Sequence, residues 1–501
     1  MTNKPAYFQL FYCLLLGFLA SFGFAPFHFF FITILSYFLL LKIIHSGKDP
    51  QKAIFLGFIF SLSHNFTSLY WIAISFETGK YGGIFLGLAA VFFLSLVLSI
   101  IFSIACFFIN KFCKNDFSYK SLIKILFILS VAEWIKGNML WGFPWMPISA
   151  IWAFNETFLY PFSVLGTWGY CLITFSLIIA FLCLREGIKK IFIFSLPFSS
   201  ILLLKIIFPP ALIDKNKSIN IRLVQPNIIQ EEKWDKSKLE FNHKKILNLI
   251  DLTGKKKESL IILPETAIPF YLDKDENKNK YLNEILKNNE IVIVGALRKE
   301  KNKNKINIFN SMFIFQKEKN YNSFHDKVKL VPFGEFIPFN KIFSFIKITT
   351  GFQDFSSGRE MTVIQINDKI RILPLICYEV IFPDLYKKEG KFDMAINITN
   401  DAWYRESIGP YQHFAHSRIR AVKEGVPLIR VANTGISAII DPKGNVSSKL
   451  NLNETGVIDR KLQIKSINTI YSKVNDSIFF IAILILLIYG FFSDKVLLRK
   501  K

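Results

Sequence analysis

Cysteine is scarce in this sequence, which has six cysteines in 501 residues. Five of the six lie in or beside long apolar runs: Cys13, Cys106, Cys113, Cys171 and Cys183. We expect these five to behave as small apolar side chains. Only Cys377 lies in the polar stretch 214–475, which therefore cannot contain an internal disulfide. Cys377 is thus either a buried structural thiol or a nucleophile.

Ionisable side chains are nearly absent from the apolar runs. Few occur there apart from Glu133, Lys136 and Lys205, which lie toward the ends of runs, so no ion or substrate path is evident and a transporter is disfavoured. The net charge of +23 is spread over Lys/Asn loops such as 301–305 and does not form one basic patch. This scatter argues against a nucleic-acid partner.

Hydrophobic residues make up 51% of the chain and are concentrated in its first 213 residues and near its C-terminus. Crossing a bilayer takes about 20 apolar residues. Suitable runs lie at 8–24, 28–45, 54–75, 84–110, 121–140, 160–184, 191–212 and 477–493. The first two are separate because Pro26 cannot continue a helix, and we expect the first to be retained since Ala25-Pro26 is a poor cleavage site. The sequence predicts a polytopic α-helical membrane protein with about eight spans.

Basic residues alternate between the connecting loops. They gather at Lys42, Lys48 and Lys52, at Lys111, Lys114 and Lys120, at Arg185, Lys189 and Lys190, and at 495–501. Loops 77–83 and 137–160 have almost none. Because basic loops stay in the cytoplasm, both termini are predicted there and 214–475 on the opposite side. The predicted domains are a membrane domain 1–213, an extracytoplasmic domain 214–475, and a final span with a basic tail 476–501.

The stretch 214–475 alternates between β-rich runs and helical patterns. Strands are predicted at Ile219–Gln225, Leu260–Pro264, Ile291–Leu297, Ile308–Phe315, Ile370–Ile376, Met394–Ile398, Leu428–Ala432 and Ala438–Asp441. Helices are predicted at Lys236–Leu252, Tyr281–Asn288 and Tyr411–Lys423. This alternation indicates an α/β domain whose strands are buried on at least one face.

Three of the predicted strands end in reactive or polar groups, in the segments Leu263–Thr266, Leu375–Glu379 and Ile396–Asp401. Sheets of this type place their chemistry at strand ends, so Glu265 and Cys377 at equivalent ends are typical of a base and a nucleophile. A thiolate mechanism also needs a cation for the developing negative charge. Lys327 is the candidate, and the alternative is an ordinary lysine in a solvated turn.

The same segments resemble motifs of the nitrilase superfamily and, together with the apolar runs, those of its membrane-embedded branch, the apolipoprotein N-acyltransferase family. The resemblance rests on Trp141–Trp145, Leu263–Thr266, Lys327 with Leu330–Glu335, Cys377–Glu379 and Asn400–Trp403. Tyr404-Arg405-Glu406 departs from the Phe-Gly more usual there. The resemblance covers nearly the whole chain, and it implies an α-β-β-α sandwich inserted between membrane helices.

The family resemblance also implies roles for individual residues. Glu265 would be the general base, Cys377 the nucleophile, and Lys327 the stabiliser of the tetrahedral intermediate, with the backbone N–H after Cys377. Supporting or substrate-binding roles are implied for five further residues: Glu335, Glu379, Tyr378, Trp234 and Asn310. Glu335 and Glu379 would otherwise be paired structural carboxylates, and Trp234 a helix-packing residue.

The implied reaction moves a fatty acyl group from a phospholipid, through a Cys377 thioester, to the α-amino group of the diacylglyceryl-cysteine of an apolipoprotein. The implied location is the bacterial inner membrane, with the catalytic domain on the periplasmic side. The alternative is a membrane-anchored amidase that uses water as acceptor; eight spans favour a bilayer substrate. His413 and His416 with Cys377 lack a fourth ligand, so we expect no metal and no cofactor.

An apolar segment follows Lys327. It contains Phe333, Phe336, Ile337, Phe339, Ile342, Phe343, Phe345 and Ile346. This is more apolar surface than a loop over water usually carries. The segment is either a lipid-facing lid or packs inside the domain.

Overall fold

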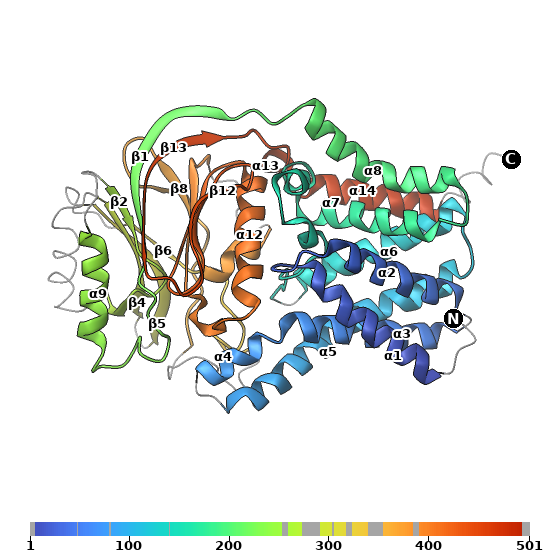
Figure 1. The fold of residues 1–501 in the computed structure, drawn as a ribbon, viewed down its shortest axis with the longest axis horizontal. Helices are drawn as coiled ribbons and strands as arrows, with labels where there is room; N and C mark the ends of the chain where they lie inside the picture. The colour runs from blue at the N-terminus through green and yellow to red at the C-terminus, as the bar shows by residue number, and fades with distance from the viewer. Residues whose placement is uncertain are drawn as a thin grey trace. The chain divides into compact units, whose positions relative to one another are not determined.

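The computed structural model describes residues 6–47, 49–79, 82–139, 141–252, 259–272, 291–302, 305–316, 323–338, 354–383 and 390–492. The chain divides into two compact units. One unit comprises residues 1–72, 88–210 and 469–501, and the other comprises 73–87 and 211–468. Figure 1 shows that the first unit is built from helices and the second from sheets with helices beside them.

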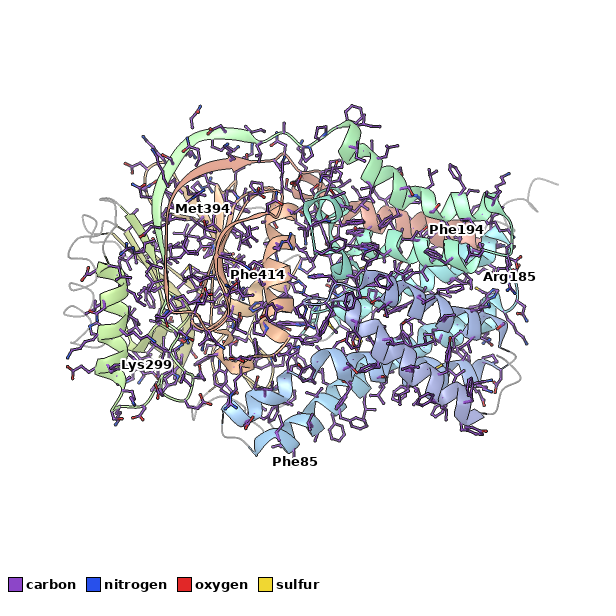
Figure 2. The ribbon with its side chains drawn as sticks, in the orientation of Figure 1. Phe85, Arg185, Phe194, Lys299, Met394 and Phe414 are labelled. Atoms are coloured by element: carbon purple, nitrogen blue, oxygen red, sulfur yellow. The ribbon has the colours of Figure 1, made fainter. Side chains whose placement is uncertain are left out.

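The helices of the first unit follow the apolar runs, except for the short α13. They are α1 (Ala6–Ala20), α2 (Phe30–Ser46), α3 (Pro50–Leu69), most of α5 (Gly83–Cys113), α6 (Tyr119–Asn138), α7 (Glu156–Leu182), α8 (Ile188–Ile207), α13 (Tyr471–Val474) and α14 (Ser477–Leu487). Polar side chains cap three of their N-termini: Asp49 on α3, Ser118 on α6 and Asn155 on α7. Phe194, labelled on α8 in Figure 2, is among the few buried side chains of that helix.

Three helices of the described residues, α5, α7 and α8, are long and apolar enough to cross a membrane. A fourth span is possible where α3 and α4 (Ile72–Thr78) form a pair bent by 43°. The helices α1 and α2 have 15 and 17 residues, about 23–26 Å at 1.5 Å per residue, which is less than a hydrocarbon core of about 30 Å. The number of eight spans therefore stays a prediction, and the basic tail 495–501 lies outside the described residues.

The second unit contains two sheets. The larger has the strand order β13 (Gly456–Ser466), β1 (Ile213–Gln225), β2 (Ser259–Ile262), β4 (Ile291–Asn302), β5 (Lys305–Gln316) and β6 (Ser323–Asp326), with β3 (Ile268–Tyr271) paired to β4. The smaller has the order β12 (Val446–Leu450), β11 (Ser437–Ile440), β10 (Leu428–Ala432), β9 (Met394–Thr399), β8 (Arg371–Ile376) and β7 (Ile364–Gln365). All eight predicted strands are confirmed.

The two faces of β4 enter different cores, as the two-residue period of a strand requires. On β4, Ile291 and Ile293 join the core that also contains smaller-sheet residues such as Ile372 and Ile396. Val292 and Val294 on the other face pack with α9 (Leu239–Asp251).

Two predicted helices are confirmed as α9 and α12 (Gly409–Glu424), while Tyr281–Asn288 lies outside the described residues. Figure 1 shows α9 outside the larger sheet and α12 outside the smaller one, so the layers run helix, sheet, sheet, helix. Figure 2 labels Phe414 on α12 and the fully buried Met394 at the start of β9. The α-β-β-α sandwich implied by the resemblance is therefore present.

Strand direction places the candidate residues at one edge of each sheet. In the smaller sheet β8, β9 and β10 are parallel, so the segments after β8 and β9 leave the sheet side by side. In the larger sheet β2 and β4 are parallel, and β6 runs the same way as β4 because two antiparallel pairings separate them. Glu265 and Lys327, which follow β2 and β6, therefore share an edge.

Candidate active site

Cys377 follows β8 directly and begins a 3-10 helix, Cys377–Ile381. Its φ of 52° lies in the left-handed region, which is uncommon for a residue with a side chain and is sustained only when neighbouring groups fix it. Its carbonyl oxygen accepts a hydrogen bond from Asn397 Nδ2 at 3.3 Å and lies 3.1 Å from His413 Nε2. The smaller sheet and α12 thus hold the turn that presents the thiol.

The fully buried carboxylate of Glu379 ties this turn to the Lys327 segment. It accepts hydrogen bonds from the backbone N–H groups of Ile376 at 2.8 Å, Val328 at 2.6 Å and Lys329 at 3.3 Å, and His325 Nε2 lies 3.3 Å away. Burial alone would raise the pKa of Glu379, but His325 and the backbone donors lower it overall. An ionised Glu379 therefore stabilises two loops that carry candidate catalytic groups.

Lys327 lies between two carboxylates. Its Nζ is 2.9 Å from Glu335 Oε1 and 3.6 Å from Glu265 Oε1, and the residue is 1% exposed. Asn310 Nδ2 donates to the same oxygens, at 2.7 Å to Glu265 and 3.1 Å to Glu335. Burial lowers the pKa of Lys327, but the two carboxylates outweigh it and the net shift is upward. Lys327 is therefore a permanent cation at this edge.

Glu265 sits on a tight turn after β2. The next residue, Thr266, has a φ of 46°, and the backbone of the turn lies against β4. A Cβ on Gly295 of β4 would come within 2.6 Å of Glu265 Cα, so only glycine fits there. On the other side, Lys233 Nζ donates to the Glu265 carbonyl oxygen at 3.0 Å and to Thr266 Oγ1 at 2.6 Å.

The electrostatics of Cys377 call for a base. Burial and the charge of Glu265 raise the pKa of the thiol, and Lys327 lowers it by less, so the thiol is protonated at neutral pH. A thiol attacks only after losing its proton, and Glu265 is the carboxylate whose charge acts on it most strongly. The three predicted residues thus belong to one electrostatically coupled group.

The metal alternative concerns a different set of ligands from the one considered in the sequence. Ligand atoms of Cys377, Asp401 and His413 lie within 4.8 Å of one another, whereas His416 is not in this group. Asp401 is already bound by Arg430 Nη2 at 2.7 Å and by His413 Nδ1 at 2.9 Å. A guanidinium among the ligands repels a divalent cation, so these residues fit a hydrogen-bonded network and not a metal site.

The weaker candidates occupy different environments. Tyr378 is buried, its ring meets Phe382 edge-on at 4.9 Å between centroids, and burial raises the pKa of its hydroxyl. Trp234 is 37% exposed, in the segment between β1 and α9.

The apolar segment after Lys327 is described only in part. Its residues Phe333, Phe336 and Ile337 are half-buried, and Phe339, Ile342, Phe343, Phe345 and Ile346 lie outside the described residues. The lipid-facing lid and packing inside the domain therefore both stay predictions for that segment.

The atypical loop after Trp403 connects to a segment from the helical half of the sequence. Ser75 Oγ, on α4, donates to the Trp403 carbonyl oxygen at 3.3 Å. Arg405 pairs with Glu77 at 3.3 Å and with Glu231 at 2.8 Å. Arg405 thus gives this loop two ion pairs within the second unit.

Sequence reasoning missed Lys233, His325 and the Asp401–Arg430 pair. Lys233 lies next to Trp234 in the sequence, and that neighbour was the only available signal. The other groups are brought together by strand pairing and by α12, which sequence spacing does not reveal.

Comparison with known proteins identifies relatives for both parts of the chain. The family described as carbon-nitrogen hydrolase matches residues 220–471, and the apolipoprotein N-acyltransferase N-terminal domain matches residues 16–183. The apolipoprotein N-acyltransferase of Rickettsia prowazekii is 35% identical, over 91% of this chain and 93% of its own. That of Rickettsia bellii is 33% identical, over 98% of both chains.

A solved structure is also similar. Nit3 of Saccharomyces cerevisiae, a member of branch 10 of the nitrilase superfamily, has a TM-score of 0.37 and 19% identity. The match covers 49% of this chain and 90% of Nit3.

Proposed function

The chain belongs to the apolipoprotein N-acyltransferase family and is an acyltransferase that N-acylates lipoproteins, and we propose that Cys377 carries the acyl group between donor and acceptor. Glu265 is the general base and Lys327 the stabiliser of the tetrahedral intermediate. The observation that carries the proposal is the placement of one cation, Lys327, between the carboxylates of Glu265 and Glu335, electrostatically coupled to a thiol on a left-handed turn.

The first half-reaction forms a thioester. Glu265 takes the proton of the Cys377 thiol, and the sulfur attacks the ester carbonyl carbon of a phospholipid. The negative charge on the carbonyl oxygen is stabilised by Lys327 and by the backbone N–H of Tyr378. The C–O ester bond then breaks, and the departing lysophospholipid oxygen receives the proton from Glu265.

The second half-reaction transfers the acyl group to an amine. The α-amino group of a diacylglyceryl-cysteine attacks the thioester carbon, a C–N bond forms and the C–S bond breaks. The amine loses its proton to Glu265, which returns it to the Cys377 sulfur. Two steps through one covalent intermediate predict ping-pong kinetics.

Supporting residues have distinct tasks in this proposal. Glu335 and Asn310 orient Lys327 and Glu265: Glu335 accepts a hydrogen bond from Lys327, and Asn310 donates to the carboxylates of both Glu265 and Glu335. Glu379 holds the Cys377 turn against the Lys327 segment. Tyr378 lines the pocket and Trp234 stands at its entrance.

The placement in the cell is part of the proposal. The domain 1–213 and the segment 476–501 lie in the bacterial inner membrane with both termini cytoplasmic, and the catalytic domain 214–475 faces the periplasm. The alternation of basic loops supports this orientation. It lets a phospholipid keep its tails in the bilayer while its ester reaches Cys377.

The test is transfer of a labelled acyl chain from phospholipid in detergent-solubilised full-length protein. We expect hydroxylamine-sensitive label on the wild type and none on Cys377→Ala. Equal labelling of both proteins would contradict a Cys377 thioester. Fatty acid released to water, with no N-acylated product, would instead point to a hydrolase.

A further inference from the structure

The buried amino group of Lys233 is not one of the groups that the proposed mechanism uses. The residue is 5% exposed and lies in the segment between β1 and α9, directly before Trp234. Its Nζ donates at 3.0 Å to the carbonyl oxygen of Glu265 and at 2.6 Å to Thr266 Oγ1. Burying an ammonium group costs free energy unless its hydrogen bonds are satisfied, so a buried lysine indicates a structural or functional role for its charge.

The acceptors of Lys233 belong to the turn that aims the proposed base. Thr266 has a φ of 46°, a strained conformation for a residue with a Cβ. Gly295 of β4 lies against one side of this turn, and Lys233 bonds to the turn from the loop before α9. The carboxylate of Glu265 is then held at 2.7 Å from Asn310 Nδ2.

Lys233 also differs from Lys327 in the charge of the groups that accept its hydrogen bonds. Lys327 has two carboxylates as direct partners, whereas the hydrogen-bond acceptors of Lys233 are a carbonyl and a hydroxyl. Burial lowers the pKa of Lys233 to about 8, while the charges of Glu265 and Cys377 oppose this fall. Its positive charge is therefore present near neutral pH and is lost at mildly alkaline pH.

We infer that Lys233 is a positioning residue for acyl transfer: it fixes the Glu265 turn and links that turn to the loop that carries Trp234. This inference rests on the proposed function, because it concerns the carboxylate assigned there as the base. The loop that meets the substrate and the turn that holds the base then move as one body. Loss of Lys233 misplaces the base without removing any reacting group.

The test compares three single variants of the full-length protein. Lys233→Met removes both hydrogen bonds and the charge, and Thr266→Val removes one of the two acceptors. Lys245→Met is the matched control, because Lys245 on α9 also donates to a carbonyl of the same loop, Asn227, at 3.1 Å. We expect kcat for N-acylation to fall about 100-fold in Lys233→Met and about tenfold in Thr266→Val, with little change in phospholipid KM. Lys245→Met should stay within about twofold of the wild type.

Two further readouts separate positioning from simple stabilisation. Lys233→Arg keeps a cationic donor, so it should recover part of the activity and extend it above pH 8, where the wild-type lysine loses its charge. Melting temperatures identify variants that fail through unfolding. Because kcat is measured on the N-acylated product and label on Cys377 is measured separately, absence of label in the wild type would contradict the proposed function while leaving the effect of Lys233 measurable. Activity of folded Lys233→Met equal to that of Lys245→Met, with unchanged pH dependence, would overturn the inference.

Discussion

Two buried charge networks flank the Cys377 turn, and they are built differently. On the side of the larger sheet, Lys327 faces the carboxylates of Glu265 and Glu335. On the side of the smaller sheet, the carboxylate of Asp401 contacts Arg430 and His413, and His413 also contacts the carbonyl oxygen of Cys377. In the first network one cation contacts two carboxylates, which suits the proposed role of Glu265 as the base. The second is internally paired and suits a structural role.

Of the variants that test the difference between the two networks, Glu265→Gln is expected to have the largest effect, on acyl-transfer activity. Loss of the proposed base should lower acyl transfer by roughly 10²–10⁴-fold. The same change removes a negative charge that raises the pKa of the Cys377 thiol, so alkylation by iodoacetamide at pH 8 should become faster. Acyl transfer and alkylation rates, measured on one preparation, should thus move in opposite directions.

Glu240→Gln, on the exposed face of α9, is the control for that variant. It should change neither rate. If Glu265→Gln left acyl transfer intact, a group other than Glu265 would accept the proton of the Cys377 thiol. The network beside the larger sheet would then not contain the base.

An intermediate effect is expected from Asp401→Asn, which leaves the Arg430 guanidinium buried without its anion. Breaking a buried pair costs about 3–5 kcal/mol, so the melting temperature should fall by roughly 6–15 °C. Asp459→Asn is the matched control, because Asp459 pairs with the buried Arg222 but is itself 36% exposed. A larger loss in Asp459→Asn than in Asp401→Asn would reverse the comparison.

The stability of the protein in acid is a second readout for Asp401→Asn. Burial would raise the pKa of Asp401, but Arg430 and His413 hold it well below its usual value. Its contribution to stability is therefore complete above the unfolded-state pKa of about 4 and is lost as the pH falls through the lower folded-state pKa. Asp401→Asn should lack this contribution in melting curves between pH 2 and pH 4.

The smallest effect is expected from Gly295→Ala. The added Cβ would contact the backbone of the Glu265 turn, so acyl transfer should fall by roughly ten- to 100-fold as the carboxylate shifts. Gly456→Ala on β13 is the control, since its Cβ would meet only an ordinary contact at 3.4 Å. Equal activities of the two variants, measured as N-acylated product, would show that the turn tolerates displacement.

The sequence predicted the central strands well because their apolar runs are continuous. It missed β12, whose residues alternate between half-buried and exposed, and β13, in which exposed polar residues interrupt the buried ones. It also missed the short strands β3, β6 and β7. The run 54–75 was predicted as one span, but the chain bends between α3 and α4 without a proline or glycine at Tyr70-Trp71 to signal it.

The site was predictable where reactive residue types follow apolar strands, as Glu265 and Cys377 do. Lys327 was a candidate from the need for a cation, but its charged loop equally fits an ordinary lysine in a solvated turn, and the family resemblance favoured the first reading. Lys233 was not predictable: its partner Glu265 lies 32 positions away in the sequence, and only the turn after β2 brings them together.

The most direct measurement is a pulse and chase of the acyl group on Cys377. Full-length protein is loaded with acyl-labelled phospholipid, freed of donor, and mixed with a diacylglyceryl-cysteine peptide, and the mass of the Cys377 peptide is followed. The account predicts an acyl mass on that peptide which disappears at the rate at which the N-acylated peptide forms. Product formation without prior acylation of Cys377, or an acyl mass that the amine does not discharge, would contradict it.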